Sequence, residues 1–309
     1  MKRMPMNSRL ADLLREGAKA GRVPLSSIGI EAARAQIAAR SRPSDVHLAA
    51  VVDESMQCAG REIGLRIYEP VNPDGGTIVF AHGGGWVLGS VDSHDGIAQR
   101  LALHSGARVV SVDYRLAPEH PFPAGLNDVA AVLERVAERF GQPIAVAGDS
   151  AGANLVAVLA RHDRDSGRHA VRAQLLIYPV ADSDTTRPSY AEREDDAALE
   201  NLTSKDMSWC WSQYVPDLAA RSDPDVAPLR ANSLEGLAPA IVVVVGHDPL
   251  RDEGLEYAHR LSAAGVEVQL HEHADLCHGF LAFLDRLPAA DDTIARVSAE
   301  FGKLLRQPT

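Results

Sequence analysis

The sequence predicts an α/β fold with a mostly parallel central sheet that carries helices on both faces. Short runs of apolar, often β-branched residues recur along the chain, and stretches with a helical pattern separate several of them. Runs that are apolar on both faces and alternate with helices are typical of parallel sheets, because helices then cover both sides. The predicted strands are Thr77–Ala81, Arg108–Val112, Ile144–Ala147, Gln174–Tyr178, Ile241–Val245 and Val266–Leu270, and the predicted helices are Ile97–Ser105, Leu126–Phe140, Ala151–His162 and Asp252–Ala264.

Three segments lie outside this alternation. Residues 8–40 have an alanine-rich helical pattern that Pro24 breaks in two, and Ile63–Tyr68 then alternates as a half-buried strand does. The charged residues 183–222 fall between two strands, where an insertion can fold over the carboxyl edge of the sheet. We therefore expect a small helical cap. The predicted organisation is N-terminal cap helices at 1–50, the first part of the core at 51–182, the cap insertion at 183–222 and the second part of the core at 223–309.

Composition argues against several classes of protein. The 309 residues suffice for one large α/β domain, and a formal charge of −11 argues against nucleic-acid binding, which needs clustered Lys and Arg. Three widely spaced cysteines without a CxxC pair predict neither a disulfide framework nor a zinc site. No apolar run reaches the length of a membrane span or of a signal peptide's core, so we expect a cytoplasmic protein without stable membrane insertion.

The strongest local feature is the sequence Gly148-Asp-Ser-Ala-Gly152, which lies between a predicted strand and a predicted helix. A serine at such a sharp turn is strained, and its hydroxyl stands above the edge of the sheet. Bulky side chains two positions to either side would collide, which explains the two glycines. The following helix directs its free amides toward the place where negative charge develops. Ser150 is the predicted nucleophile, and an ordinary glycine-rich turn with an N-capping serine is the alternative.

A run of three glycines, Gly83, Gly84 and Gly85, follows another predicted strand. Consecutive glycines leave their amides unobstructed and allow a substrate to approach the backbone closely. Two of these amides, with the amide of Ala151, are predicted to form the oxyanion hole. The run completes neither GxxxxGK[ST] nor GxGxxG, which argues against a nucleotide site. His82 precedes the glycines and is expected to brace the loop rather than to act as a base.

A serine nucleophile needs a general base and a carboxylate that orients the base. In α/β-hydrolases these groups follow the serine in the order Asp or Glu, then His. Asp248 follows the strand Ile241–Val245, at the carboxyl end where open sheets form their sites, and His278 follows the last predicted strand. Asp248 and His278 are therefore the predicted acid and base. His271 and His273 share one strand face as a metal half-site does, but no further pair has metal spacing, so no metal is expected.

Five blocks of sequence resemble the bacterial hormone-sensitive-lipase family of esterases. The blocks are HGGGW (His82–Trp86), DYRLAPEHPFPA (Asp113–Ala124), GDSAG (Gly148–Gly152), DPLRDEG (Asp248–Gly254) and HGF (His278–Phe280). They occur in the order that the family has, and chance would have to supply every block at once. The resemblance is therefore highly specific.

The resemblance implies a carboxylesterase or lipase-like serine esterase with the α/β-hydrolase fold, the catalytic triad of Ser150, Asp248 and His278, and no cofactor. It also implies a small-molecule ester substrate with a short-to-medium acyl chain, and relatives often form homodimers. Two positions depart from the family. Ala153 replaces a glycine that many relatives have, and His247 stands where an aromatic residue is common.

The cap is expected to line an apolar pocket for the acyl chain. Met207 and Trp211 are four residues apart and would share a helix face, and together with Trp86 they are the predicted substrate-binding residues. The alternative is that these side chains pack the cap onto the core. Two other functions remain open: amide hydrolysis, as in arylformamidase-like relatives, and ligand binding without catalysis. The presence of all three triad residues favours an enzyme.

Overall fold

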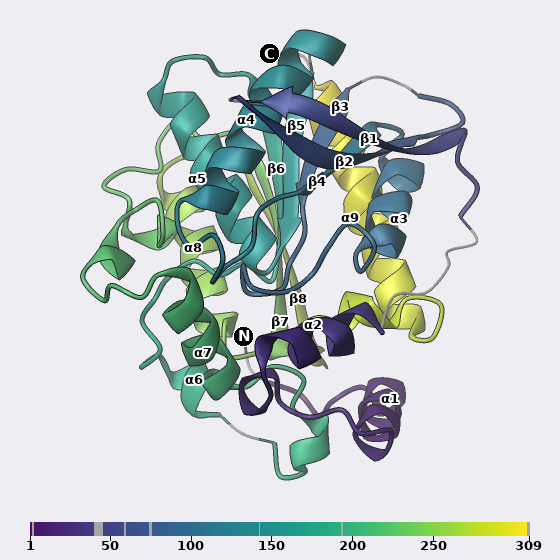
Figure 1. Cartoon of the computed structure of the whole chain (residues 1–309), viewed down its shortest axis with the longest axis vertical. Coiled ribbons are helices and arrows are strands. Elements are labelled where there is room, and N and C mark those ends of the chain that lie inside the picture. The colour runs from purple at the N-terminus through teal and green to yellow at the C-terminus, as the bar shows by residue number, and fades with distance from the viewer. Residues whose placement is uncertain are drawn as a thin grey trace.

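A single sheet organises the protein, whose computed structural model describes residues 1, 3–39, 46–58, 60–73, 76–141, 143–192 and 194–307. Within these residues the sheet has eight strands in the order β1-β2-β4-β3-β5-β6-β7-β8 (Figure 1). Their bounds are β1 Ala50–Cys58, β2 Arg61–Glu69, β3 Thr77–Ala81, β4 Arg108–Asp113, β5 Ile144–Asp149, β6 Val171–Ile177, β7 Ala240–His247 and β8 Val268–Cys277. The β1–β2 and β2–β4 pairs are antiparallel and the other pairs are parallel. The predicted mostly parallel α/β-hydrolase sheet is confirmed.

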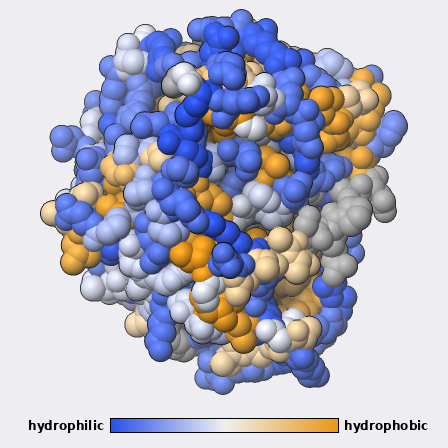
Figure 2. All heavy atoms as spheres, viewed as in Figure 1, coloured by the Kyte–Doolittle hydropathy of each residue, from blue (hydrophilic) through white to orange (hydrophobic). Residues whose placement is uncertain are grey.

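The edge strand β1 is absent from the sequence prediction. Its side chains are mostly exposed, including Val51 at 45% and Val52 at 47%, and only Met56 and Cys58 are buried. Figure 2 shows apolar side chains at the upper right of the molecule, where this end of the sheet lies. The strand exists because it pairs along its whole length with β2. Backbone pairing of this kind does not require a strict apolar alternation, so the pattern of side chains gave no signal.

Helices cover both faces of the sheet (Figure 1). One face carries α3 (Asp95–Ser105) and α9 (Pro288–Arg306), and the other carries α4 (Ala124–Phe140), α5 (Ala151–Asp165) and α8 (Arg251–Ala263). Successive strand residues point to opposite faces, so β3 directs Ile78 and Phe80 into one core and Val79 into the other. None of the helices in the described ranges is both long and apolar enough to cross a membrane.

Two segments that are distant in sequence meet at the carboxyl edge of the sheet. The N-terminal one contains α1 (Ser8–Lys19), η1 (Leu25–Ser27) and α2 (Ile30–Ala38), and the one between β6 and β7 contains α6 (Pro188–Ala191), η2 (Ala197–Leu199), α7 (Ser204–Tyr214), η3 (Ala220–Ser222) and η4 (Pro228–Arg230). Arg22 joins them by donating to the carbonyls of Ala198 at 2.7 Å and Glu200 at 2.9 Å. Residues 2 and 40–45 of the predicted N-terminal segment lie outside the described residues.

A cluster of three aromatic side chains fixes α7 to the loop that follows β3. Trp86 stacks on Tyr214 with 4.3 Å between ring centroids, and the ring of Trp211 lies 4.6 Å from that of Trp86. All three are buried, with at most 2% of their surface exposed. Aromatic side chains bury more surface than most others, so this cluster contributes strongly to holding the insertion on the core.

Replacing Trp211 by alanine tests this packing. We expect Trp211→Ala to lower the free energy of unfolding by about 3–5 kcal/mol, because the deletion leaves a cavity. Urea denaturation followed by circular dichroism measures the change. The control is Leu218→Ala in the same insertion, where the side chain is 73% exposed, and we expect a change within about 0.5 kcal/mol. Equal effects of the two substitutions would contradict the buried role of Trp211.

Candidate active site

Ser150 lies at the turn between β5 and α5. Its backbone has φ 54° and ψ −119°, in a region that residues other than glycine rarely adopt. The turn is held in place because the Ser150 amide donates to the carbonyl of Ile177 at 2.8 Å. A Cβ atom on Gly152 would overlap the carbonyl oxygen of Ala81, so only glycine lets α5 approach the end of β3 this closely. Strain of this kind persists where the surrounding structure enforces it, and it is common at active sites.

The structure brings together the three side chains predicted as nucleophile, base and acid. His278 Nε2 lies 2.9 Å from Ser150 Oγ, and His278 Nδ1 lies 2.8 Å from Asp248 Oδ2. The other Asp248 oxygen accepts the Leu250 amide at 2.8 Å. A carboxylate accepts hydrogen bonds, so this geometry assigns the imidazole proton to Nδ1 and leaves Nε2 to accept from the serine hydroxyl. All three residues are buried, with 6–8% exposed.

The amides of the glycine loop after β3 are of two kinds: one is hydrogen-bonded within the protein, and two can bind a ligand oxygen. Gly83 donates its amide to Asp149 Oδ1 at 2.8 Å, so this amide is engaged within the protein. The amides of Gly84, Gly85 and Ala151 have no hydrogen-bond partner among the described residues. Gly84 and Gly85 also line the cavity at Ser150, and Gly83 does not. The candidate oxyanion amides are therefore those of Gly84, Gly85 and Ala151, and Gly83 is corrected to a residue that braces the loop.

Asp149 and His82 support this loop from below. Burial alone would raise the pKa of Asp149, but the neighbouring His94 and the Gly83 amide outweigh it and lower that pKa. The carboxylate therefore stays charged and keeps its hold on the glycine loop. Burial lowers the pKa of His82 to about 3, so this imidazole is neutral at ordinary pH. It stacks on Tyr114 with 4.3 Å between the rings, which suits a structural residue and not a base.

A second serine–histidine pair lies beside the first. Ser93 Oγ is 2.9 Å from His94 Nδ1, and His94 Nε2 is 3.4 Å from Asp149 Oδ1. The Ser93 hydroxyl, however, donates to the carbonyl of Ser90 at 3.0 Å. The oxygen of this hydroxyl is then left to accept from His94 Nδ1, while the other ring nitrogen of His94 faces the Asp149 carboxylate. Ser93 therefore accepts from this histidine and has no base for its own proton. The sequence analysis did not find His94, because a lone histidine after a glycine loop carries no pattern.

An apolar cavity opens at Ser150 and encloses about 120 Å³. Core elements supply its floor. The wall above them comes from the N-terminal segment and the insertion, through Leu25, Ile37, Leu202, Met207 and Cys210. In the space-filling view, apolar side chains interrupt the hydrophilic surface around α2, close to this wall (Figure 2).

The predicted substrate-binding residues separate into two groups. Met207 lines the cavity, whereas Trp86 and Trp211 do not. Both tryptophans are at most 1% exposed and pack against Tyr214 in the aromatic cluster. For these two residues the prediction is corrected in favour of its alternative, packing of the insertion onto the core. The sequence could not separate the two roles, because Met207 and Trp211 share one helix and both are buried.

Comparison with known proteins identifies the family. The sequence model of a family described as alpha/beta hydrolase fold matches residues 78–282. The chain belongs to this family, in its branch of hormone-sensitive-lipase-like esterases, so the resemblance seen in the sequence is confirmed.

Three similar proteins illustrate the relationship. Esterase LipI of Mycobacterium tuberculosis is 40% identical over 280 residues, which cover 87% of this chain and 86% of that protein. Carboxylesterase NlhH of the same organism is 40% identical over 292 residues, or 90% of each chain. The crystal structure of a thermostable esterase from Pseudomonas putida ECU1011 superposes with a TM-score of 0.91 at 34% identity, covering 98% of this chain and 99% of that one.

The glycine loop can be tested at Gly84, whose φ is +119° and whose added Cβ would overlap the Leu88 carbonyl oxygen. The methyl group of Gly84→Ala would force the loop to move and would take its amide away from the oxyanion position. We therefore expect kcat for ester hydrolysis to fall by about 10²–10³-fold, the cost of losing one oxyanion donor. The matched control is Gly29→Ala, where φ is −66° and an added Cβ meets nothing within 4 Å. A Gly84→Ala enzyme as active as this control would remove the loop from the oxyanion hole.

Proposed function

We propose that this protein hydrolyses carboxylic esters of short-to-medium acyl chain through an acyl-enzyme formed on Ser150. The observation that carries the proposal is the hydrogen-bonded chain from Asp248 through His278 to Ser150 at the mouth of an apolar cavity. The broader enzyme class, carboxylic-ester hydrolase, is confirmed, because the family members that match include an esterase and a carboxylesterase.

The first half of the reaction forms the acyl-enzyme. His278 Nε2 takes the proton of the Ser150 hydroxyl as Oγ attacks the ester carbonyl carbon. The carbonyl oxygen becomes negatively charged and accepts hydrogen bonds from the amides of Gly84, Gly85 and Ala151. Collapse of this tetrahedral intermediate breaks the bond to the alcohol oxygen. His278 Nε2 returns the proton to that oxygen, and the alcohol leaves.

The second half releases the acid. Water gives a proton to His278 Nε2 and attacks the acyl carbon, and the same amides hold the second oxyanion. The bond to Ser150 Oγ then breaks, and the proton returns from His278 to the serine. Asp248 keeps its negative charge throughout, because its task is to orient the imidazole and to stabilise the imidazolium that forms twice in each cycle.

The dimensions of the cavity support the chain-length part of the proposal. About 120 Å³ lies between Ser150 and a wall that includes Met207 and Leu202. An apolar pocket of this size favours small acyl groups, because a longer chain would have to displace packed side chains of its wall. A cytoplasmic location stays a prediction from the sequence, and a homodimer stays an expectation from the resemblance to the family.

The proposal is tested with p-nitrophenyl esters from acetate to palmitate. We expect the largest kcat/KM for short or middle chains and a steep fall toward palmitate, because the cavity is small. Ser150→Ala should remove nearly all of the activity. Ser93→Ala should keep it, because the Ser93 hydroxyl lacks a base. The corresponding p-nitroanilides test amide hydrolysis, and a preference for them over esters would contradict the proposed substrate class, as would a flat chain-length profile.

A further inference from the structure

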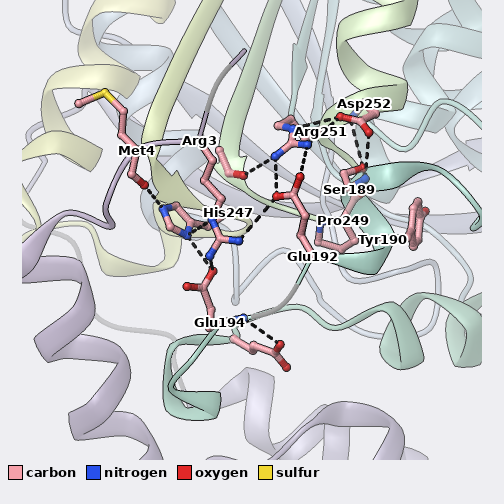
Figure 3. A network of polar contacts seen from close by, with 12 residues as sticks. Arg3, Met4, Ser189, Tyr190, Glu192, Glu194, His247, Pro249, Arg251 and Asp252 are labelled. Atoms are coloured by element: carbon pink, nitrogen blue, oxygen red, sulfur yellow. Dashed lines mark hydrogen bonds and ion pairs between the residues drawn. The ribbon is translucent and has the colours of Figure 1, made fainter.

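The loop that carries Asp248 is enclosed by parts of the chain that are distant in sequence. This loop, residues 246–252, comprises the end of β7, the turn 248–250 and the start of α8, and Figure 3 shows side chains from the N-terminus and from the insertion converging on it. His247 is the last residue of β7. It directly precedes the acid in the sequence, and its backbone carbonyl accepts the amide of His278 at 3.2 Å. A displacement of His247 therefore reaches both Asp248 and His278.

The imidazole of His247 is clamped from two sides. Nε2 donates to the carbonyl of Met4 at 2.8 Å. Nδ1 lies 2.7 Å from Glu194 Oε1 and 3.0 Å from Arg3 Nε, and Arg3 also forms an ion pair with Glu194 (Figure 3). Only 4% of the His247 side chain and 13% of the Glu194 side chain are exposed. Water therefore competes little for the hydrogen bond between His247 Nδ1 and Glu194.

Both protonation states of His247 have partners in this arrangement. The neutral imidazole accepts at Nδ1 from Arg3 Nε, and the charged imidazole donates from Nδ1 to the Glu194 carboxylate. Nε2 keeps its proton and its bond to the Met4 carbonyl in either state. Nδ1 therefore has one hydrogen-bond partner in either state. A phenylalanine could fill this space, but it could make none of these bonds.

Side chains of the insertion and their partners hold the rest of the loop through its backbone carbonyls. Ser189 Oγ donates to the carbonyl of Pro249 at 2.6 Å. Arg251 donates to the carbonyl of Gly246 at 3.3 Å, and its guanidinium is itself fixed by two hydrogen bonds of 2.8 and 2.6 Å to Glu192. Asp248 thus lies in the sequence between Gly246 and Pro249, whose carbonyl groups are restrained by Arg251 and Ser189.

The N-terminus extends the same restraint to the base. The amide of Met4 donates to the carbonyl of Ala274 at 3.1 Å, and the amide of Asn7 donates to the carbonyl of Asp275 at 2.9 Å. These carbonyls belong to the end of β8, which leads directly to His278. Residues 3–7 therefore bridge the loop of the acid and the strand of the base.

We propose that Arg3 and Glu194 are positioning residues that act through His247 to hold Asp248 and His278 in the geometry needed for proton transfer. The inference rests on the proposed function and adds to it that the N-terminal segment is part of the catalytic machinery. A displacement of about 1 Å in a reacting group can cost on the order of 10²-fold in rate. Loss of the clamp should therefore lower kcat, whereas binding in the apolar cavity should change little.

The test compares Arg3→Ala and Glu194→Ala with wild type, using p-nitrophenyl butyrate and kcat normalised to the serines that an organophosphate titrates. We expect kcat to fall about 10-fold or more, with KM within about threefold. Glu194→Gln should recover most of the rate, because the amide oxygen still accepts from Arg3. The matched control is Arg15→Ala. Arg15 also joins α1 to the insertion, through Asp196 at 2.9 Å, but this pair is exposed and does not touch the loop of Asp248.

Each outcome decides the proposal. Variants at Arg3 and Glu194 with kcat within twofold of wild type would overturn it, as would an increase in KM without a fall in kcat. A fall equal to that of Arg15→Ala would also overturn it, because general loosening of the cap would then explain the loss. His247→Phe gives an independent reading, and a normal kcat in that variant would overturn the role of the imidazole. If wild type hydrolyses no ester, the proposed function fails and the inference falls with it; an active wild type with unaffected variants overturns the inference alone.

Discussion

The close approach of α5 to the end of β3 is the constraint on which the site depends. A side chain at Gly152 would overlap the carbonyl of Ala81, so the helix can begin there only because this residue is glycine. The approach places Ser150 beside the loop of Gly84 and Gly85 and forces the serine to φ 54°. The proposed nucleophile and the candidate oxyanion donors thus share one small space, and the free energy stored in the strained turn is offset by the packing of two buried elements.

The sheet order brings the remaining groups to this place. β3 and β5 are neighbours, and β6, β7 and β8 follow β5 in parallel register, so the loops after β3, β5, β7 and β8 all open at one edge. Ser150, Asp248 and His278, the proposed nucleophile, acid and base, come from three of those loops. The N-terminal segment and the insertion then close this edge, and through His247 they also brace it. The same two segments therefore supply the upper wall of the pocket and the contacts that brace the loop of Asp248.

The sequence predicted the parts of this protein that depend on local patterns. Ser150, Asp248 and His278 each follow a buried strand, and parallel strands necessarily end at a common edge. Other features depend on contacts between distant segments and gave no local signal. The pairing of Gly83 with Asp149, the placement of Trp86 and Trp211 in an aromatic cluster and the bonds of His247 to the N-terminus are of this kind. The edge strand β1 was missed because most of its side chains face solvent.

The central claim is that Ser150 Oγ attacks the substrate, and covalent labelling tests it most directly. Diethyl p-nitrophenyl phosphate should transfer one diethylphosphoryl group to the protein as p-nitrophenolate leaves, and His278 should take the serine proton. Intact-mass and peptide mass spectrometry measure the number and the position of the adducts. The account predicts one adduct per chain, at Ser150, with loss of esterase activity in proportion to labelling. Labelling at Ser93, or full loss of activity without an adduct at Ser150, would contradict it.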